Sequence, residues 1–324
     1  MKAAILAAPG TSPIYGDFGE PVAQPAEELI TVNASALSHF TKARASGAHY
    51  SADRAYPAVA GADGVGKTRD GRRVYFVLPE PPFGALAEKT LIRSANCIPI
   101  PAEVDDVTAA AIANPGMSSW AALAERALLK PGETVLVNGA TGIAGRLAVQ
   151  IARYMGASKV IATARDEIAL NELKNIGADF IIPFKLGDGH SAGEHEYEMA
   201  LQEHFANGVD VVLDYLWGRS AQIAIVAAAK AGKETVPIRF IHVGGASRED
   251  VQLPGAALRS SAIVLMGSGI NSIPPEKLLS AIRGVFQAVK PAKLRINTKP
   301  VPLSDVEKTW NADPGKSRIV FIVR

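Results

Sequence analysis

Residues 134–146 read TVLVNGATGIAGR, and this stretch decides the fold of the 324-residue chain. It opens with an apolar run that is typical of a buried strand, and the run ends at Asn138. The glycines that follow match the G-x-G-x-x-G turn of dinucleotide-binding folds, with Ala140 at the first glycine position. Apolar residues then recur on one helical face as far as Gly156, a typical helix stop. This order of strand, turn and helix predicts a dinucleotide-binding unit.

Two glycines of the turn have separate physical tasks. Gly142 lets the backbone approach a pyrophosphate with no Cβ in the way, and Gly145 lets the helix pack closely on the strand. The free N–H groups of the first helical turn, around Ile143 and Ala144, face phosphate at the positive end of the helix. We therefore expect cofactor contacts from Thr141 to Ala144. The alternative is a tight structural turn that binds no nucleotide.

Strands and helices alternate after this turn. The predicted strands are short and continuously apolar, as expected for strands buried on both faces of a sheet. They are Thr134–Asn138, Val160–Thr163, Phe180–Ile182, Val209–Leu213, Ile238–Val243 and Ile263–Met266. The stretches between them are helical in pattern. Six such units predict an α/β fold with a Rossmann-type, doubly wound, six-stranded parallel sheet.

The first 110 residues follow a different pattern and are expected to be rich in strands, because short apolar runs alternate with Pro and Gly clusters. The runs include Glu28–Val32, Arg73–Leu78 and Ala87–Ile92. Two helices are expected next, Val107–Ala113 and Ser118–Leu129, with a break between them at Asn114-Pro115-Gly116.

The end of the chain departs from the strand–helix alternation. Glu276–Val289 has the spacing of an amphipathic helix, and Thr298–Val301 and Arg318–Val323 are expected to be strands. These strands are expected to return to the first domain. We therefore predict a β-rich domain made of residues 1–113 and 270–324, and a Rossmann domain made of residues 114–269.

Composition excludes several classes of protein. Hydrophobic residues make up 48% and charged residues 20%, and the net charge of +2 gives no reason to expect a nucleic-acid or membrane partner. Cys97 is the single cysteine, which forbids an intramolecular disulfide and suits a reducing compartment. No apolar run reaches the roughly 18–20 residues of a membrane span, and the N-terminal run is too short for a signal peptide. We expect a cytoplasmic protein that binds a small molecule.

The second predicted strand bears on the choice of cofactor. It is followed by Ala164-Arg165-Asp166, at the place where an NAD site usually has an acid for the ribose 2′-hydroxyl. The guanidinium of Arg165 suits a 2′-phosphate instead, so the sequence favours NADP. The alternative is that Arg165 is solvated and Asp166 serves as the acid of an NAD site.

An ordered set of short segments resembles the medium-chain dehydrogenase/reductase superfamily, specifically its zinc-independent quinone oxidoreductase (zeta-crystallin-like) branch. Besides the glycine turn, the set comprises Ala34–His39, Ala45–Gly47, Gly61–Gly66, Phe83–Glu88, Lys130–Glu133, Gly177–Asp179 and Gly315-Lys316. The resemblance covers nearly the whole chain. It implies a β-rich GroES-like catalytic domain beside the Rossmann domain, and a homodimer.

The resemblance also implies site residues. Ser118 matches a hydroxyl near the nicotinamide, and Ser38 and Tyr50 match the substrate side. Further cofactor contacts are expected in loops after the later strands, at Leu216, Trp217, Val243, Gly244, Gly245, Gly267, Ser268 and Gly269. These positions agree with the rule that ligands bind beyond the carboxyl ends of parallel strands. No catalytic residue is assigned.

Zinc-dependent relatives are excluded on chemical grounds. Their metals need Cys and His ligands, and one cysteine cannot build either site; Ser38 stands where a ligand cysteine would be expected. The only His-rich stretch holds His190, Glu194, His195 and His204, which we interpret as surface residues, so no metal is predicted.

A short-chain dehydrogenase is a weaker alternative. Its glycine turn would lie near the N-terminus, and none of the tyrosines here has a lysine four residues later. We therefore predict a zinc-free NADPH-dependent oxidoreductase that transfers hydride to a quinone or to an α,β-unsaturated carbonyl. The alternative is a non-catalytic, crystallin-like NADPH-binding protein.

Overall fold

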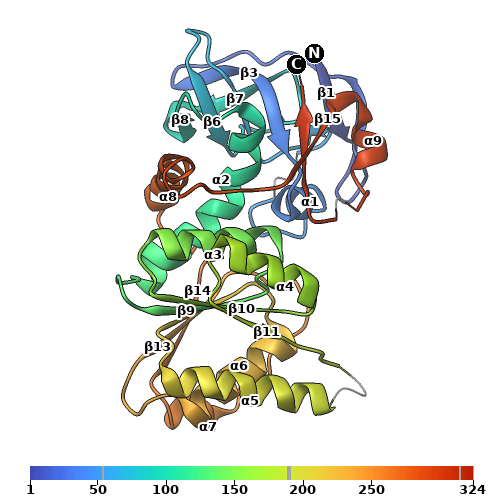
Figure 1. The fold of residues 1–324 in the computed structure, drawn as a ribbon. Coiled ribbons are helices and arrows are strands. Elements are labelled where there is room, and N and C mark those ends of the chain that lie inside the picture. The colour runs from blue at the N-terminus through green and yellow to red at the C-terminus, as the bar shows by residue number, and fades with distance from the viewer. Residues whose placement is uncertain (53–54, 188–190, 314, 324) are drawn as a thin grey trace. The chain divides into compact units, whose positions relative to one another are not determined.

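The structure, a computed structural model, describes residues 1–52, 55–187, 191–313 and 315–323 (Figure 1). The chain divides into two compact units. Unit 1 consists of Met1–Asn114, Ile282–Lys290 and Arg295–Arg324, and unit 2 consists of Pro115–Ala281 and Pro291–Leu294. No helix in the described part of the chain is both long and apolar enough to cross a membrane.

Unit 2 is built on a six-stranded parallel sheet with the order β11-β10-β9-β12-β13-β14. Its strands are β9 (Thr134–Asn138), β10 (Lys159–Ala164), β11 (Phe180–Pro183), β12 (Val211–Asp214), β13 (Ile238–His242) and β14 (Ile263–Gly267). Numbered within the sheet, this is the 3-2-1-4-5-6 order of the Rossmann fold. The predicted fold class is confirmed, and each predicted strand is found with its ends shifted by at most two residues.

Helices cover both faces of this sheet. In Figure 1, α3 and α4 lie on one side and α5, α6 and α7 on the other. Their bounds are α3 (Ile143–Tyr154), α4 (Glu167–Leu173), α5 (Ser191–Asn207), α6 (Gly218–Ala231) and α7 (Gly255–Arg259), with a 3₁₀ turn at Lys174–Ile176. The α5–α6 side is sealed by a buried cluster that includes Leu136, Ile161, Tyr197, Leu201, Phe205, Val212 and Phe240.

The predicted helix break at Pro115 is wrong. A single helix, α2 (Asp106–Ala121), runs through Pro115 and continues as a π-helix over Ala122–Ala127. A proline inside a helix costs about 3 kcal/mol because its nitrogen cannot donate a hydrogen bond. Here the five residues before Asn114 are all completely buried, and that apolar burial outweighs the local cost.

Unit 1 is rich in strands, as predicted. Its larger sheet has the order β15-β16-β3-β5-β6-β8, with β7 also paired to β3, and its smaller sheet has the order β2-β1-β4. The strands are β1 (Lys2–Leu6), β2 (Ile14–Asp17), β3 (Glu27–Ala36), β4 (Ala58–Val59), β5 (Asp63–Lys67), β6 (Arg73–Val77), β7 (Lys89–Arg93), β8 (Cys97–Pro99), β15 (Thr298–Pro302) and β16 (Arg318–Ile322).

The remaining helices are short, apart from one. They are α1 (His39–Ala45), α8 (Pro275–Ala288) and α9 (Val306–Thr309), with 3₁₀ turns at Ser94–Asn96 and Leu303–Asp305. The helix α8 matches the amphipathic helix predicted at Glu276–Val289, and β15 and β16 match the two strands predicted at the end of the chain. Both strands lie in unit 1, because β16 pairs with β3.

Unit 1 also buries a charged cluster. The Tyr75 hydroxyl donates to Asp63 Oδ2 at 2.9 Å, and the guanidinium of Arg318 is buried nearby. Burial raises the pKa of Asp63 to about 6, and the positive charge of Arg318 and the Tyr75 hydrogen bond oppose that rise. Asp63 Oδ1 and two guanidinium nitrogens of Arg318 have no hydrogen-bond partner among the described residues. The folded state therefore favours a protonated Asp63 more than the unfolded chain does.

Candidate functional site

The glycine turn joins β9 to α3 and is tied to the neighbouring strand. Gly139 has a φ of +85°, and the N–H groups of Gly139 and Ala140 both donate to the Thr163 carbonyl at 3.0 Å. Gly142 then forms the N-cap of α3 in an extended conformation, and its N–H donates to the Gly139 carbonyl at 3.2 Å. The turn is thus fixed against the carboxyl end of β10.

The two later glycines of the turn differ in the space around them. A Cβ at Gly145 would lie 2.3 Å from the Gly139 carbonyl oxygen and 2.7 Å from Ala140 Cα, so only glycine fits. A Cβ at Gly142 would meet only the Gly139 oxygen, at 3.5 Å. The absence of a side chain at Gly145 therefore lets the helix pack directly against the turn, whereas the space where a Cβ of residue 142 would lie is open. This is the cradle that a pyrophosphate requires.

The first turn of α3 is open to an anion. In the described part of the chain, no side chain caps this helix end and no acidic residue lies in its first turn. The N–H groups of Ile143 and Ala144 have no acceptor within the helix, and Thr141, Ile143 and Ala144 are half-buried. Backbone donors at the positive end of a helix dipole favour a phosphate here.

The end of β10 shows how its two charged residues are used. Arg165 follows Ala164, the last residue of β10, and its side chain is exposed. Asp166 is the N-cap of α4, and its carboxylate accepts from the Ala169 N–H at 2.9 Å. One oxygen of this acid therefore caps a helix, and the exposed guanidinium of Arg165 lies beside it at the same strand end.

The loop after β12 is organised by a buried carboxylate. Asp214 is completely buried, and it accepts hydrogen bonds from the N–H groups of Leu216 and Trp217 at 3.0–3.2 Å. These bonds hold Trp217 at a φ of +62°, a left-handed conformation that costs about 1–3 kcal/mol in a residue other than glycine. Leu216 and Trp217, two predicted cofactor contacts, are thus fixed at the carboxyl edge of the sheet.

The loops after β13 and β14 lie beside the loop after β12. The N–H groups of Val243 and Gly244 donate to the Asp214 carbonyl at 2.8 and 3.2 Å, and Gly245 is exposed. At the end of β14, Gly267 and Gly269 are exposed. Ser268, between them, is half-buried, and its N–H donates to the His242 carbonyl at 2.8 Å. The structure thus brings the predicted cofactor-contact residues after β12, β13 and β14 to neighbouring strand ends.

Ser118 lies on α2, where its hydroxyl donates to the Pro115 carbonyl at 2.9 Å. The adjacent Ser119 is buried and donates to the Ala144 carbonyl at 3.2 Å, and its hydroxyl lies 2.8 Å from the Tyr215 hydroxyl. Burial raises the pKa of Tyr215, so this phenol stays protonated. Ser119 and Tyr215 therefore connect α2 with the first turn of α3, a link that the sequence analysis does not identify.

The two predicted substrate-side residues belong to unit 1. Ser38 is buried and is the N-cap of α1: its Oγ accepts from the Thr41 N–H at 2.8 Å and donates to Thr41 Oγ1 at 2.9 Å. Tyr50 is 62% exposed, and its ring lies 4.1 Å from that of His49. The structure does not place Ser38 and Tyr50 in one contact.

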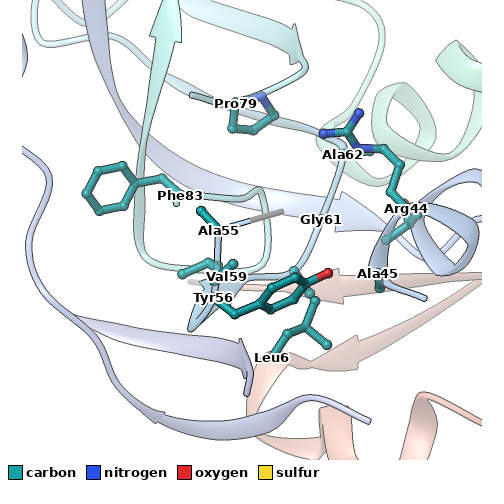
Figure 2. Close-up of a pocket in the computed structure, with 13 residues that line it drawn as sticks. Leu6, Arg44, Ala45, Ala55, Tyr56, Val59, Gly61, Ala62, Pro79 and Phe83 are labelled. Atoms are coloured by element: carbon teal, nitrogen blue, oxygen red, sulfur yellow. The ribbon is translucent and has the colours of Figure 1, made fainter. Parts of the chain in front are cut away.

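A small, open pocket lies in unit 1, with about 480 Å³ of empty space that includes open solvent (Figure 2). Most of its lining residues are apolar, but its accessible surface is more polar than apolar, with polar groups from Thr41, Arg44 and Tyr56. Arg44 and Phe83 approach it from opposite sides in Figure 2. The remaining lining residues are Leu6, Ala45, Ala55, Ala58, Val59, Ala60, Gly61, Ala62 and Pro79. Neither Ser38 nor Tyr50 lines the pocket, but Thr41, the hydrogen-bond partner of Ser38, does.

Beneath the glycine turn lies a buried polar network that the sequence analysis also misses. Asn138 donates from Nδ2 to Asp214 Oδ1 at 2.8 Å and to Ser220 Oγ at 3.0 Å, and it accepts from Thr163 Oγ1 at 2.8 Å. The Tyr197 hydroxyl donates to Thr163 Oγ1 at 3.2 Å. The available signal in the sequence is a polar residue at or next to the end of the apolar strands β9, β10 and β12.

The metal-ligating residue types are dispersed. In the ranges that the structure describes, no three His, Cys, Asp or Glu side chains are close enough to hold a metal ion. Burial raises the pKa of the Cys97 thiol to about 11, and Glu194 pairs with Arg219 at 2.6 Å, which lowers the pKa of Glu194. His195 is exposed on α5, His204 stacks edge-on against Phe180, and His190 lies outside the described residues.

Comparison with known proteins points to one superfamily. A model of the zinc-binding dehydrogenase family matches residues 144–282, a segment that contains no cysteine. A probable NADPH-dependent quinone reductase of Emericella nidulans is 28% identical over 96% of each chain. Prostaglandin reductase-3 of Bos taurus is 28% identical over 74% of this chain and 64% of its own.

A solved structure agrees over the full length. The quinone oxidoreductase of Thermus thermophilus, also solved with NADPH, is 26% identical and matches the whole of both chains with a TM-score of 0.80. The strand order of unit 2, its glycine turn and the strand-rich unit 1 match what the resemblance implies. These findings support the assignment of the chain to the medium-chain dehydrogenase/reductase superfamily, in its quinone oxidoreductase branch.

Proposed function

We propose that the protein is a zinc-free, NADPH-dependent oxidoreductase that transfers hydride to a quinone or to an α,β-unsaturated carbonyl. The observation that carries the proposal is the glycine turn. Backbone atoms fill the space that a Cβ at Gly145 would need, whereas the space beside Gly142 is open, next to the uncapped start of α3. The full-length relative that is described as an NADPH-dependent quinone reductase supports the same activity.

The use of NADPH rather than NADH is supported by the end of β10. Arg165 is exposed there, and a guanidinium can bind two oxygens of a 2′-phosphate at once. The Asp166 carboxylate, which an NAD site would need for the ribose hydroxyls, already accepts a hydrogen bond in the cap of α4. Arg165 would therefore attract the 2′-phosphate of NADPH, while the neighbouring Asp166 caps α4.

The chain's own residues would bind and orient the dinucleotide. Thr141, Gly142, Ile143 and Ala144 would hold the pyrophosphate, and Ser118 would lie near the nicotinamide. The strand-end loops would line its path with Leu216, Trp217, Val243, Gly244, Gly245, Gly267, Ser268 and Gly269. When bound, the nicotinamide supplies the hydride, so the protein needs no metal or flavin for that step.

The acceptor would bind to residues of unit 1. The pocket in Figure 2 combines apolar residues such as Val59 and Phe83, which suit the carbon frame of a quinone or enone, with the hydroxyl groups of Thr41 and Tyr56, which can donate to an acceptor oxygen. We keep Ser38 and Tyr50 as proposed substrate-side residues; Ser38 would act by fixing Thr41 rather than by direct contact. Ser38→Ala should then alter turnover more than cofactor affinity.

The quaternary structure that we propose is a homodimer formed through β14. This strand is at the edge of the unit 2 sheet, and it is apolar from Ile263 to Met266, with Val264 44% exposed. An unpaired apolar edge is a template for pairing with a second copy. We also propose that the enzyme acts in the cytoplasm on a small molecule, since its single cysteine suits a reducing compartment.

An acceptor panel tests the activity. NADPH oxidation should be followed by absorbance with quinones, enones and simple ketones, using the purified protein and a heat-denatured control. We expect oxidation with quinones or enones and not with simple ketones. Tight NADPH binding without oxidation by any acceptor would favour the non-catalytic alternative. Turnover of enones alone would restrict the enzyme to enone reduction, the activity suggested by the prostaglandin reductase relative.

A further inference from the structure

Four polar side chains form a row across the carboxyl end of the unit 2 sheet. In the strand register, Thr163 is level with Asn138, Asn138 with Asp214, and Asp214 with His242. Residues that are level on neighbouring parallel strands project from the same face of the sheet. The row therefore crosses β10, β9, β12 and β13 on a single face.

Hydrogen bonds connect the row from end to end. Thr163 Oγ1 donates to Asn138 Oδ1 at 2.8 Å, and Asn138 Nδ2 donates to Asp214 Oδ1 at 2.8 Å. Asp214 Oδ2 lies 3.4 Å from Nδ1 of His242. The first three members are completely buried, whereas the His242 side chain is 34% exposed. His242 is thus the member of the row that a ligand can reach.

The partners of Asp214 fix the role of each ring nitrogen of His242. Among the described residues, the other hydrogen bonds to this carboxylate come from the Asn138 amide and from the backbone N–H groups of Leu216 and Trp217. A carboxylate that only accepts requires a donor at Nδ1 of the histidine. In the neutral ring, Nε2 then carries the lone pair and accepts.

The surroundings of His242 restrain its ring. The indole of Trp217 lies 4.3 Å from the imidazole, at an interplanar angle of 42°. Trp217 is itself held by two hydrogen bonds to Asp214 in a left-handed conformation. His242 is also the last residue of β13, directly before the Val243–Gly245 loop. A ring restrained on two sides presents its acceptor in a fixed direction.

Strand order tells which half of a dinucleotide would pass this ring. With the pyrophosphate on the turn after β9 and the 2′-phosphate at Arg165 after β10, the adenosine half occupies the β10 side. The other half must then extend over β12 and β13. That half carries N–H donors on its carboxamide and O–H donors on its ribose.

We propose that His242 is a cofactor-binding residue, whose Nε2 accepts a hydrogen bond from the nicotinamide–ribose half of NADPH, and that Asp214 is its positioning residue. The inference rests on the proposed function, because it assumes that the dinucleotide lies on the glycine turn. It adds a hydrogen-bond acceptor to a set of loops in which Ser268 is otherwise the polar aliphatic side chain. It also gives the buried row a task, which is to set the tautomer of one histidine.

The positioning half of the proposal can be tested without any cofactor. ¹⁵N NMR of the imidazole, at about pH 8.5 where an ordinary histidine is neutral, distinguishes the two tautomers. We expect His242 to carry its proton on Nδ1, with the resonance assigned by its loss in His242→Asn. A proton on Nε2 in the unmodified protein overturns the proposal.

A substitution of Asp214 provides the matching perturbation. Asp214 Oδ1 accepts from three N–H groups, those of Asn138, Leu216 and Trp217, and Oδ2 accepts from one of them, Trp217, so in Asp214→Asn the amide oxygen should occupy the Oδ1 position. The amide NH₂ would then face His242 and donate to Nδ1. We expect the proton of the ring to move to Nε2 and NADPH affinity to fall. A folded variant with an unchanged tautomer contradicts the positioning role. Should the variant not fold, the tautomer of the unmodified protein decides.

The contact itself is tested by titrating NADPH. The His242 Nε2 resonance should shift on binding, and His242→Phe, which keeps a ring beside Trp217 but lacks the acceptor, should bind NADPH roughly fivefold more weakly. His242→Gln, which restores an acceptor at similar reach, should recover part of the affinity. His204→Gln is the matched control, because His204 contacts Phe180 at the opposite, amino end of a strand.

The outcomes separate the two proposals. NADPH that binds the unmodified protein without shifting His242, or that binds His242→Phe as tightly, overturns the contact and leaves the proposed function intact. Absence of NADPH binding by the unmodified protein overturns the proposed function and the contact with it, while the tautomer measurement still decides the role of Asp214.

Discussion

The glycine turn yields a pair of substitutions with opposite consequences. In Gly145→Ala the new Cβ would sit 2.3 Å from the Gly139 oxygen and 2.7 Å from Ala140 Cα, which are backbone atoms, so α3 must move outward by about 1 Å. Overpacking of this kind costs about 1–3 kcal/mol, and alanine's better helix propensity offsets it by at most about 1 kcal/mol. We expect Gly145→Ala to lower the free energy of unfolding by about 1–2 kcal/mol.

Gly142→Ala is the matched control within the same turn. Its Cβ would meet one atom at 3.5 Å, and the φ of −68° suits alanine, so stability should be unchanged or slightly higher. The methyl group would instead occupy the space for the pyrophosphate. Losing one or two charge-assisted backbone hydrogen bonds there should weaken NADPH binding roughly 10- to 100-fold.

Two assays check this pair: denaturant unfolding monitored by circular dichroism, and NADPH titration monitored by tryptophan fluorescence. Each variant should fail mainly in one of them. A Gly145→Ala protein as stable as the unmodified chain would refute the packing role of Gly145. A Gly142→Ala protein with unchanged NADPH affinity would refute the placement of the pyrophosphate on this turn.

Three further predictions concern other parts of the molecule. Arg165→Ala should weaken NADPH binding roughly tenfold and leave NADH binding nearly unchanged, as measured by calorimetry, and an equal loss for both cofactors would remove Arg165 from the 2′-phosphate site. Asp63 has an ordinary pKa of 3.8 and a folded-state pKa of about 6, so its protonated form stabilises the fold below about pH 4 and this contribution is lost as the pH rises to 6. Relative to Asp63→Asn, the unmodified protein should thus lose stability between pH 4 and 6 in urea unfolding, and a difference that does not change with pH would contradict the assignment. Val264→Lys should convert a dimer to monomers in light scattering, whereas a dimer that survives the charge would place the interface elsewhere.

The hydrophobic pattern of the sequence was sufficient to predict the strands whose residues are buried all along their length. The runs at Thr134–Asn138 and Val160–Thr163 are almost entirely apolar, because helices cover both faces of the sheet. A continuous apolar run therefore predicts a buried parallel strand without further information. Gly145 was equally predictable, because the backbone that excludes a Cβ there is close in sequence: the Cβ would lie 2.3 Å from the Gly139 oxygen and 2.7 Å from Ala140 Cα.

Features that depend on contacts between distant segments could not be predicted from the hydrophobic pattern. The helix α2 continues through Pro115 because tertiary burial outweighs the local penalty, and a local pattern carries no information on that burial. The link from Asn138 to Asp214 spans 76 residues and depends on the register of two strands. The pocket likewise combines Leu6, Arg44 and Phe83, which meet only in the folded unit 1.

Hydride transfer from an NADPH bound in one orientation is the central claim, and isotopically labelled cofactor tests it most directly. Two samples of NADPH, each carrying deuterium at one of the two C4 hydrogens, should be oxidised by the enzyme with a quinone or enone acceptor. A cofactor held in one orientation predicts that one sample yields NADP⁺ free of deuterium and that the other retains its label. Retention in both samples at comparable, partial levels, or no enzyme-dependent oxidation of either, would contradict the account.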